Sequence, residues 1–184
     1  MYGMNDERST RILLILRHAK SSWKNKKLDD HDRPLNKRGR SEAIKMGKYF
    51  NKMSILPNLI ITSSALRAIE TTKYVCRHAR YENLVEVNSS LYGSNIDNYI
   101  SVISTAFKTK DKLLIIGHNP VLEELVRFTA NKIITLPTCT LVQINLIFEN
   151  QDSISLHDNF RSEIENVWRP RDPIESNNLW ENRN

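Results

Sequence analysis

The sequence has little cysteine, and its two cysteines form no recognisable site. Only Cys76 and Cys139 are present among 184 residues, and they match no metal-ligand spacing. Neither lies in a glycine-containing loop with a nearby arginine, the usual setting of a cysteine that attacks phosphate. We therefore expect two reduced, buried thiols without a catalytic role.

Long apolar runs are also missing. The longest stretches, Ile12–Leu16 and Leu113–Ile116, are far shorter than the roughly 20 residues that a helix needs to cross a bilayer. Residues 1–10 are polar and contain no apolar signal region. The sequence therefore predicts a cytoplasmic protein with no membrane partner.

Positive charge is in excess, but it does not form a nucleic-acid pattern. The formal net charge is +6, a balance compatible with nucleic acid, an anionic surface or a phosphorylated substrate. Lysine and arginine are scattered, with local density at 24–27 and 33–40, and no basic stripe alternates with aromatic residues. We expect no nucleic-acid partner.

What the sequence does contain is an alternation of short apolar strands and amphipathic helices. The expected strands are 11–16, 59–62, 84–87 and 113–116, and the expected helices are 36–51, one starting near Ser63 or Ser64, 96–107 and 120–130. This alternation is typical of an α/β fold with a mainly parallel sheet.

The length suits a single domain, residues 1–184. Segments 141–148 and 153–157 resemble a closing hairpin around a polar turn. From residue 161 the chain becomes polar, with two prolines and several asparagines. We expect a core of about 11–160 and a loosely packed tail of about 161–184.

Three polar segments each follow a predicted strand directly. They are Leu16–Trp23, Thr62–Arg67 and Ile116–Pro120. In parallel α/β sheets, ligands bind beyond the carboxyl ends of the strands. We therefore expect these segments to bring two arginines and two histidines to one edge of the sheet.

Such a cluster would suit a phosphoryl group. Arg17 and Arg67 can each offer a planar fork of donors to phosphate oxygens, and Ser21 is a further candidate ligand. A neutral His18 can attack phosphorus through a ring nitrogen. His118, if protonated, can stabilise the developing negative charge.

We expect this cationic site to need no metal or other cofactor. Asp29, Asp30 and Asp32 form the nearest acidic cluster, but they lack a convincing ligand arrangement. No histidine shows zinc-ligand spacing, and His31 is interpreted as a surface loop residue. Arg33 is expected to anchor the loop before the helix.

The segment Arg17-His18-Ala19-Lys20-Ser21-Ser22-Trp23 resembles the signature of the histidine phosphatase superfamily, in its branch of SixA-type phosphohistidine phosphatases. Further matching segments follow in order: 32–35, 38–39, 63–71, 91–92 and 117–120. The resemblance covers about 11–146 and implies a phosphoglycerate-mutase-like, three-layer α/β/α fold. It also implies a phosphate pocket of Arg17, His18, Arg67 and His118. Position 19 is alanine where much of the superfamily has glycine, although alanine is usual in the Arg-His-Ala-Lys group.

Many members of that superfamily carry an acidic residue in the middle of the chain, which protonates the leaving oxygen. This chain departs from that pattern. The matching stretch, residues 91–97, has no glutamate. Asp97 is the nearest carboxylate and a candidate acid, although a carboxylate also favours the start of a helix. An alkoxide needs a proton to leave, whereas a phosphorylated imidazole leaves more easily. The sequence thus favours a labile phosphoryl donor.

Three functions remain open at this point. The favoured one is a metal-independent phosphatase that forms a phosphohistidine intermediate on His18 and acts on phosphohistidine in a protein. A small-molecule phosphomonoesterase, for a sugar phosphate or nucleotide, is the alternative. A non-catalytic phosphate-binding module is disfavoured by the presence of His18, because arginines alone would suffice to hold an anion. The partner is thus a phosphorylated protein or a small phosphorylated substrate, and the oligomeric state is undecided, a monomer included.

Overall fold

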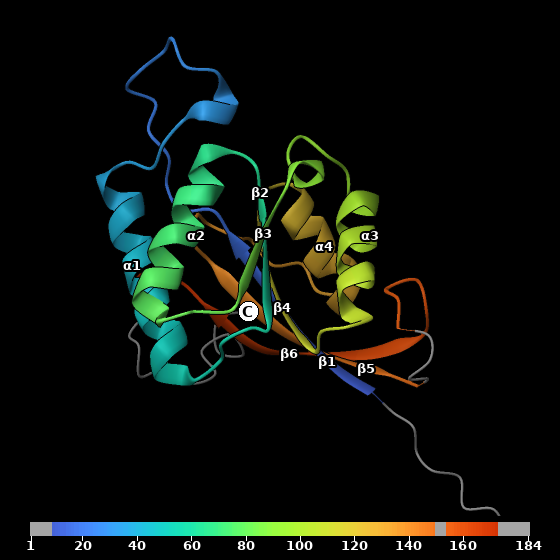
Figure 1. The fold of residues 1–184 in the computed structure, drawn as a ribbon. Helices are drawn as coiled ribbons and strands as arrows, with labels where there is room; N and C mark the ends of the chain where they lie inside the picture. Colours follow the sequence, from blue (N-terminus) through green and yellow to red (C-terminus); the bar gives the residue numbers. More distant parts are fainter. Residues whose placement is uncertain (1–8, 150–153, 173–184) are drawn as a thin grey trace, which may run out of the picture.

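A six-stranded sheet forms the centre of the molecule (Figure 1). The structure is a computed structural model, and it describes residues 9–149 and 154–172. The strands are β1 (Ser9–Arg17), β2 (Leu59–Ser63), β3 (Leu84–Asn88), β4 (Lys112–Gly117), β5 (Leu141–Phe148) and β6 (Phe160–Trp168). Their order is β3-β2-β4-β1-β5-β6. The first four are parallel, β5 runs antiparallel to β1, and β6 antiparallel to β5. The expected mainly parallel sheet is confirmed.

Helices cover both faces of the sheet. The pair α1 (Lys37–Met53) and α2 (Leu66–Ala79) lies on one face, and α3 (Ile96–Phe107) and α4 (Val121–Ala130) lie on the other (Figure 1). Two short 3-10 turns, η1 (Asp30–Asp32) and η2 (Ser89–Leu91), complete the described elements. The three-layer α/β/α arrangement is confirmed.

Strand β1 supplies side chains to both cores. Leu13 and Ile15 belong to the cluster beneath α3 and α4, whereas Leu14 and Leu16 belong to the cluster beneath α1 and α2. All four are fully buried. A strand covered on both faces has to be apolar at every position, which explains its unbroken hydrophobic run.

The expectation for the carboxyl-terminal part is wrong. The second hairpin strand is β6 at Phe160–Trp168, not 153–157, so the sheet continues past the expected boundary at 160. Trp168 is 2% exposed and stacks on Tyr49, with ring centroids 4.7 Å apart. The strand looked like a tail because its first half is exposed and therefore polar. Residues 173–184 of the expected tail lie outside the described part.

The start of α2 also differs from expectation. Its N-cap is Ala65, which makes no side-chain capping bond, and neither Ser63 nor Ser64 serves as the cap. Ser63 is the last residue of β2 and is fully buried. Its hydroxyl has a different partner, which belongs to the site described next.

Candidate active site

The parallel strands bring the predicted residues to one edge of the sheet. Arg17 ends β1 opposite Gly117 of β4, and His18 and His118 follow these two residues. The centroids of the two imidazole rings are 5.0 Å apart. Arg67, in the first turn of α2, places its Nε 3.3 Å from Nε2 of His18. Three separate segments therefore build one cationic cluster.

The ring of His18 is held in one tautomer. Its Nδ1 lies 2.8 Å from the carbonyl oxygen of Ala19, and a carbonyl oxygen can only accept a hydrogen bond. The proton is therefore on Nδ1, and Nε2 is unprotonated and carries the lone pair. Nε–H of Arg67 donates to that nitrogen. His18 consequently presents Nε2 to the cluster as its nucleophilic atom.

Burial and positive neighbours keep both imidazoles neutral. Burial lowers the pKa of His18 to about 3, opposed by its hydrogen bond to Ala19 and assisted by the charges of His118, Arg67 and Arg17. Burial likewise lowers the pKa of His118 to about 4, with Arg67 as the next cause. His18 is thus neutral, as a nucleophile has to be. His118 is neutral as well when no ligand is bound, so the protonated form that would stabilise negative charge is not present in this state.

His118 is oriented by the end of β2. Its Nε2 lies 2.8 Å from the hydroxyl oxygen of Ser63, and its buried Nδ1 has no hydrogen-bond partner among the described residues. The same hydroxyl oxygen also accepts a hydrogen bond from the backbone N–H of Ala65 at 3.4 Å. The role of Ser63 could not be read from its position before a helix.

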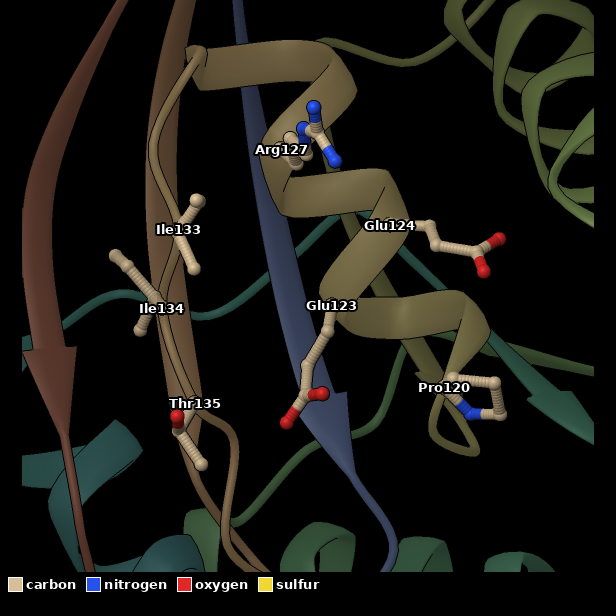
Figure 2. Close-up of a pocket in the computed structure, with 7 residues that line it drawn as sticks. All are labelled: Pro120, Glu123, Glu124, Arg127, Ile133, Ile134 and Thr135. Atoms are coloured by element: carbon tan, nitrogen blue, oxygen red, sulfur yellow. The ribbon is translucent and has the colours of Figure 1, made fainter.

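Arg17 is positioned by the segment that follows α4. Its Nη1 donates to the carbonyl oxygen of Leu136 at 2.7 Å. Glu123 accepts hydrogen bonds from the backbone N–H of Leu136 (2.8 Å) and the side chain of Asn119 (2.6 Å). Figure 2 shows Glu123 on the side of α4 that faces residues 133–135, where it helps line a pocket of about 220 Å³. Burial lowers the pKa of Arg17, and the charge of Glu123 opposes this shift.

Side chains of α2 hold the loop that follows His18. The hydroxyl of Thr71 accepts a hydrogen bond from the backbone N–H of Ala19 at 3.0 Å, and the carboxylate of Glu70 accepts one from the N–H of Leu35 at 2.6 Å. Thr71 also donates to the carbonyl oxygen of Arg67, at 2.7 Å. The segment Arg67–Thr71 therefore supports this loop and also carries Arg67, the arginine beside His18.

Arg33 anchors the loop between β1 and α1, as expected. It donates to the carbonyl oxygen of Ser22 (3.1 Å) and the hydroxyl of Ser21 (2.7 Å), and its guanidinium lies 3.1 Å from the ring centroid of Trp23. Ser21 is 7% exposed and forms an isolated β-bridge with Leu35. These contacts give Ser21 a structural role, and its role as a phosphate ligand stays a prediction.

Asp30 is a site residue that the sequence argument missed. Its Oδ2 lies 2.9 Å from Nη2 of Arg67 and 3.1 Å from the hydroxyl of Tyr92, and its Oδ1 lies 2.6 Å from Nη1 of Arg33. The sequence indicated Asp30 only as a poor metal ligand. The position of Asp30 three residues before Arg33 could have indicated an ion pair between these two side chains. Its ion pair with Arg67 depends on the fold and has no such local signal.

Two aromatic rings stand at the rim of the site. Tyr92 meets the ring of His118 edge-on at 5.7 Å and that of His31 at 4.8 Å. Nε2 of His31 lies 3.0 Å from the hydroxyl oxygen of Ser64. His31 is the middle residue of η1 and is partly exposed, and these contacts place it at the rim of the site.

Asp97 lies apart from these contacts. It is exposed in the first turn of α3, behind the N-cap Asn95. Within the described residues, no hydrogen bond or ion pair joins Asp97 to Arg17, His18, Arg67 or His118. Its position fits a carboxylate that favours a helix start, and its role as an acid stays a prediction.

The cysteines and the side chains that could ligate a metal are the remaining candidates from the sequence. Both cysteines are free, and burial raises the pKa of Cys76 to about 11 and that of Cys139 well above its usual value. Across 9–149 and 154–172, no group of three or more histidine, cysteine, aspartate or glutamate side chains is arranged to hold a metal ion. Nor does any helix of these segments have the length and apolarity to cross a membrane.

Sequence comparisons point to one superfamily. Residues 13–91, which include Arg17, His18 and Arg67, match the model of the histidine phosphatase superfamily (branch 1). An uncharacterised chloroplastic protein of Arabidopsis thaliana is 33% identical over 142 residues, covering 71% of this chain and 64% of that protein. A broad-specificity phosphatase of Saccharomyces cerevisiae is 31% identical over 104 residues, covering 55% and 44%. The chain thus spans less than two thirds of either relative.

Solved structures confirm the fold. The SixA protein of Agrobacterium tumefaciens has a TM-score of 0.73 at 24% identity, covering 87% of this chain and 98% of that chain. A protein histidine phosphatase SixA complexed with tungstate has a TM-score of 0.73 at 17% identity, covering 86% and 97%. A phosphoglycerate mutase of Bacillus anthracis has a TM-score of 0.63 at 16% identity, covering 86% and 94%. The expected phosphoglycerate-mutase-like fold is therefore present.

Proposed function

We propose that this chain, which belongs to the histidine phosphatase superfamily, is a metal-independent phosphatase that hydrolyses phosphohistidine in a protein. The single observation that carries the proposal is the state of His18. Its Nε2 is unprotonated, because Nδ1–H is held by the carbonyl of Ala19, and the lone pair of Nε2 points to the guanidinium of Arg67, where a phosphoryl group would bind.

The reaction has two steps. Nε2 of His18 attacks phosphorus while the bond from phosphorus to the leaving nitrogen breaks, which leaves a phosphoryl group on His18. The Nδ1–H bond to Ala19 stabilises the positive charge that this ring gains. Water then attacks the phosphohistidine, and inorganic phosphate leaves. The imidazole returns to its neutral state.

The surrounding cations stabilise the phosphoryl oxygens in both steps. Arg17 and Arg67 supply donors and charge, which are the main sources of catalysis in phosphoryl transfer. A phosphoryl dianion would offset the positive charges that lower the pKa of His118, so its binding favours protonation of this imidazole. His118 would then become a third cationic donor.

Two observations support phosphohistidine as the substrate. The fold resembles that of a protein histidine phosphatase, and no carboxylate of residues 91–97 is in contact with the four site residues, so departure of an alkoxide lacks an evident acid. The partner we propose is accordingly a phosphorylated protein. The cytoplasmic location and the lack of a nucleic-acid partner stay predictions.

A small-molecule phosphomonoesterase is the second candidate. It is favoured by the similarity to the broad-specificity phosphatase of yeast. Comparing kcat/KM for a phosphohistidine-containing protein with that for a sugar phosphate separates the two. A higher value for the sugar phosphate would contradict the protein substrate.

The catalytic role of His18 is tested with p-nitrophenyl phosphate, whose leaving group needs little help from an acid. We expect turnover that persists in EDTA and falls at least about a thousandfold in His18→Ala, because the nucleophile is lost. The matched control is His157→Ala, which changes an exposed histidine and should retain wild-type kcat. Turnover that survives in His18→Ala, or that EDTA abolishes, would refute the mechanism.

A further inference from the structure

We propose that Asp30 recognises the leaving imidazole of the substrate, by accepting a hydrogen bond from the ring nitrogen that is not bonded to phosphorus. This inference rests on the proposed function. It makes Asp30 a specificity-determining residue that separates phosphohistidine from phosphate esters.

Asp30 occupies the end of the Arg67 guanidinium that is remote from the nucleophile. Nε of Arg67 donates to His18, whereas Nη2 donates to the carboxylate of Asp30 at 2.9 Å and Nη1 to its backbone carbonyl at 2.5 Å. The guanidinium therefore spans the distance from the attacking nitrogen to this carboxylate. A phosphoryl group that binds to Arg67 beside His18 would have Asp30 at its far side.

The far side is where the leaving group emerges. Phosphoryl transfer places the attacking and leaving atoms roughly in line, so a group expelled by Nε2 of His18 departs away from that ring. A phosphoryl group also takes over donors of Arg67 and thereby releases Oδ2 of Asp30 from Arg67, which leaves this oxygen able to accept a second hydrogen bond. The carboxylate keeps its bonds to Arg33 (2.6 Å) and Tyr92 (3.1 Å), which hold it in place for a new donor.

The charge of Asp30 suits an acceptor. Partial burial acts to raise the pKa of this carboxyl, but hydrogen bonds from Arg33 and Tyr92 and the charge of Arg67 outweigh it, and the pKa is lowered. The group is therefore ionised and can only accept hydrogen bonds. With half of its side chain exposed, it remains accessible to a substrate ring.

The step balances without a further reactant. A phosphohistidine ring with a proton on its distal nitrogen receives the electron pair of the breaking P–N bond and leaves as neutral imidazole. The distal proton stays on the ring and is shared with Asp30. An alkyl or aryl phosphate has no such N–H, so the carboxylate does nothing for its departure.

The experiment compares two substrates of one active site, N-phosphorylimidazole and p-nitrophenyl phosphate, in wild type and Asp30→Asn. We expect kcat/KM for N-phosphorylimidazole to fall about tenfold, the lower end for a hydrogen bond to a charged group. For p-nitrophenyl phosphate, kcat/KM should rise, because the contact that competes for Arg67 weakens. Asp30→Glu should restore part of the preference. Asp29→Asn, which changes a neighbouring exposed carboxylate, should leave both values unchanged.

The outcomes distinguish the two proposals. An unchanged ratio of the two kcat/KM values, or an equal fall for both substrates, would overturn the role of Asp30 while the phosphatase stands. If Asp30→Asn only strengthens phosphate binding, the residue is a competitor for Arg67 and not a recognition group. Absence of turnover of both substrates by wild type would overturn the proposed function and this inference together.

Discussion

At the scale of single residues, the surroundings of each imidazole set its chemistry. His18 and His118 are buried beside Arg17 and Arg67, and burial is the largest cause of their low pKa values. An exposed histidine would be partly protonated near neutral pH, and a protonated ring has no lone pair for attack. The site therefore keeps its nucleophile neutral mainly by burying it, and the cations that would attract phosphate lower its pKa further.

This arrangement predicts an acid-sensitive fold. Both pKa values lie below the ordinary histidine value, so the unfolded chain binds more protons than the folded one below about pH 6.5. Stability is thus lost as the pH falls from about 6.5 towards 4. Between pH 7.5 and pH 4.5, the free energy of unfolding should fall in both proteins. We expect the fall to be about 2 kcal/mol smaller in His118→Gln than in wild type.

Urea unfolding at the two pH values measures this difference. His157→Gln, which removes an exposed histidine instead, should follow wild type. An equal loss of stability in wild type and His118→Gln would show that the ring of His118 is not held neutral by its environment.

At the scale of elements, the loop after β1 is shaped by the helices against which it packs. Gly39, in the first turn of α1, lies so close to Lys20 that an added Cβ would overlap the carbonyl oxygen of Lys20. The same carbonyl oxygen accepts a hydrogen bond from the backbone N–H of Asn36. The side chain of Asn36 in turn caps α1, because it accepts a hydrogen bond from the N–H of Gly39 at 2.8 Å. Helix and loop therefore cannot shift independently.

A methyl group at this contact should displace the loop that follows β1 and begins with His18. We expect Gly39→Ala to lower kcat/KM for p-nitrophenyl phosphate on the order of a hundredfold, the cost of misplacing reacting groups by about 1 Å. The matched control is Gly47→Ala in the same helix, where a Cβ would come within 2.5 Å of the carbonyl oxygen of Val75 in α2. Both variants should have a lower Tm, but only Gly39→Ala should lose activity beyond its loss of folded protein. Equal kcat/KM in the two folded variants would contradict this coupling.

At the scale of the whole molecule, the site joins segments from both ends of the described chain. His18 and His118 directly follow β1 and β4, Arg67 lies in α2, Asp30 lies in η1, and Leu136 holds Arg17 from the segment after α4. A ligand that binds all of these segments stabilises the folded state alone. Oxyanion binding should therefore be visible in the stability of the entire domain.

Tungstate, a phosphate-like oxyanion, is the probe for this linkage. At 100 times its Kd, it should stabilise the wild type by about 2.7 kcal/mol and raise Tm accordingly. Arg67→Gln should lose most of this shift, because the guanidinium beside His18 is removed. Arg77→Gln, an exposed position of the same helix, should retain it. A full shift in Arg67→Gln would mean that tungstate binds elsewhere.

The sequence alone determined the four parallel strands, the four helices and the meeting of four residues. Apolar runs such as Leu13–Leu16 identify strands that are buried on both faces. Parallel strands end at one edge, so Arg17, His18 and His118 had to lie near one another. The order of the motifs pointed to the superfamily by resemblance. These inferences succeed because they depend on local pattern and on a general rule of sheet topology.

Only the tertiary structure decided the rest. The Asp30–Arg67 ion pair joins residues 37 positions apart, and the contact of His118 with Ser63 joins residues 55 apart, so no local pattern encodes either. Strand β6 looked like a tail because half of its residues face solvent, and its pairing with β5 is what defines it. Side-chain chemistry that depends on long-range approach, and strands defined by their neighbours, become visible only once the chain is folded.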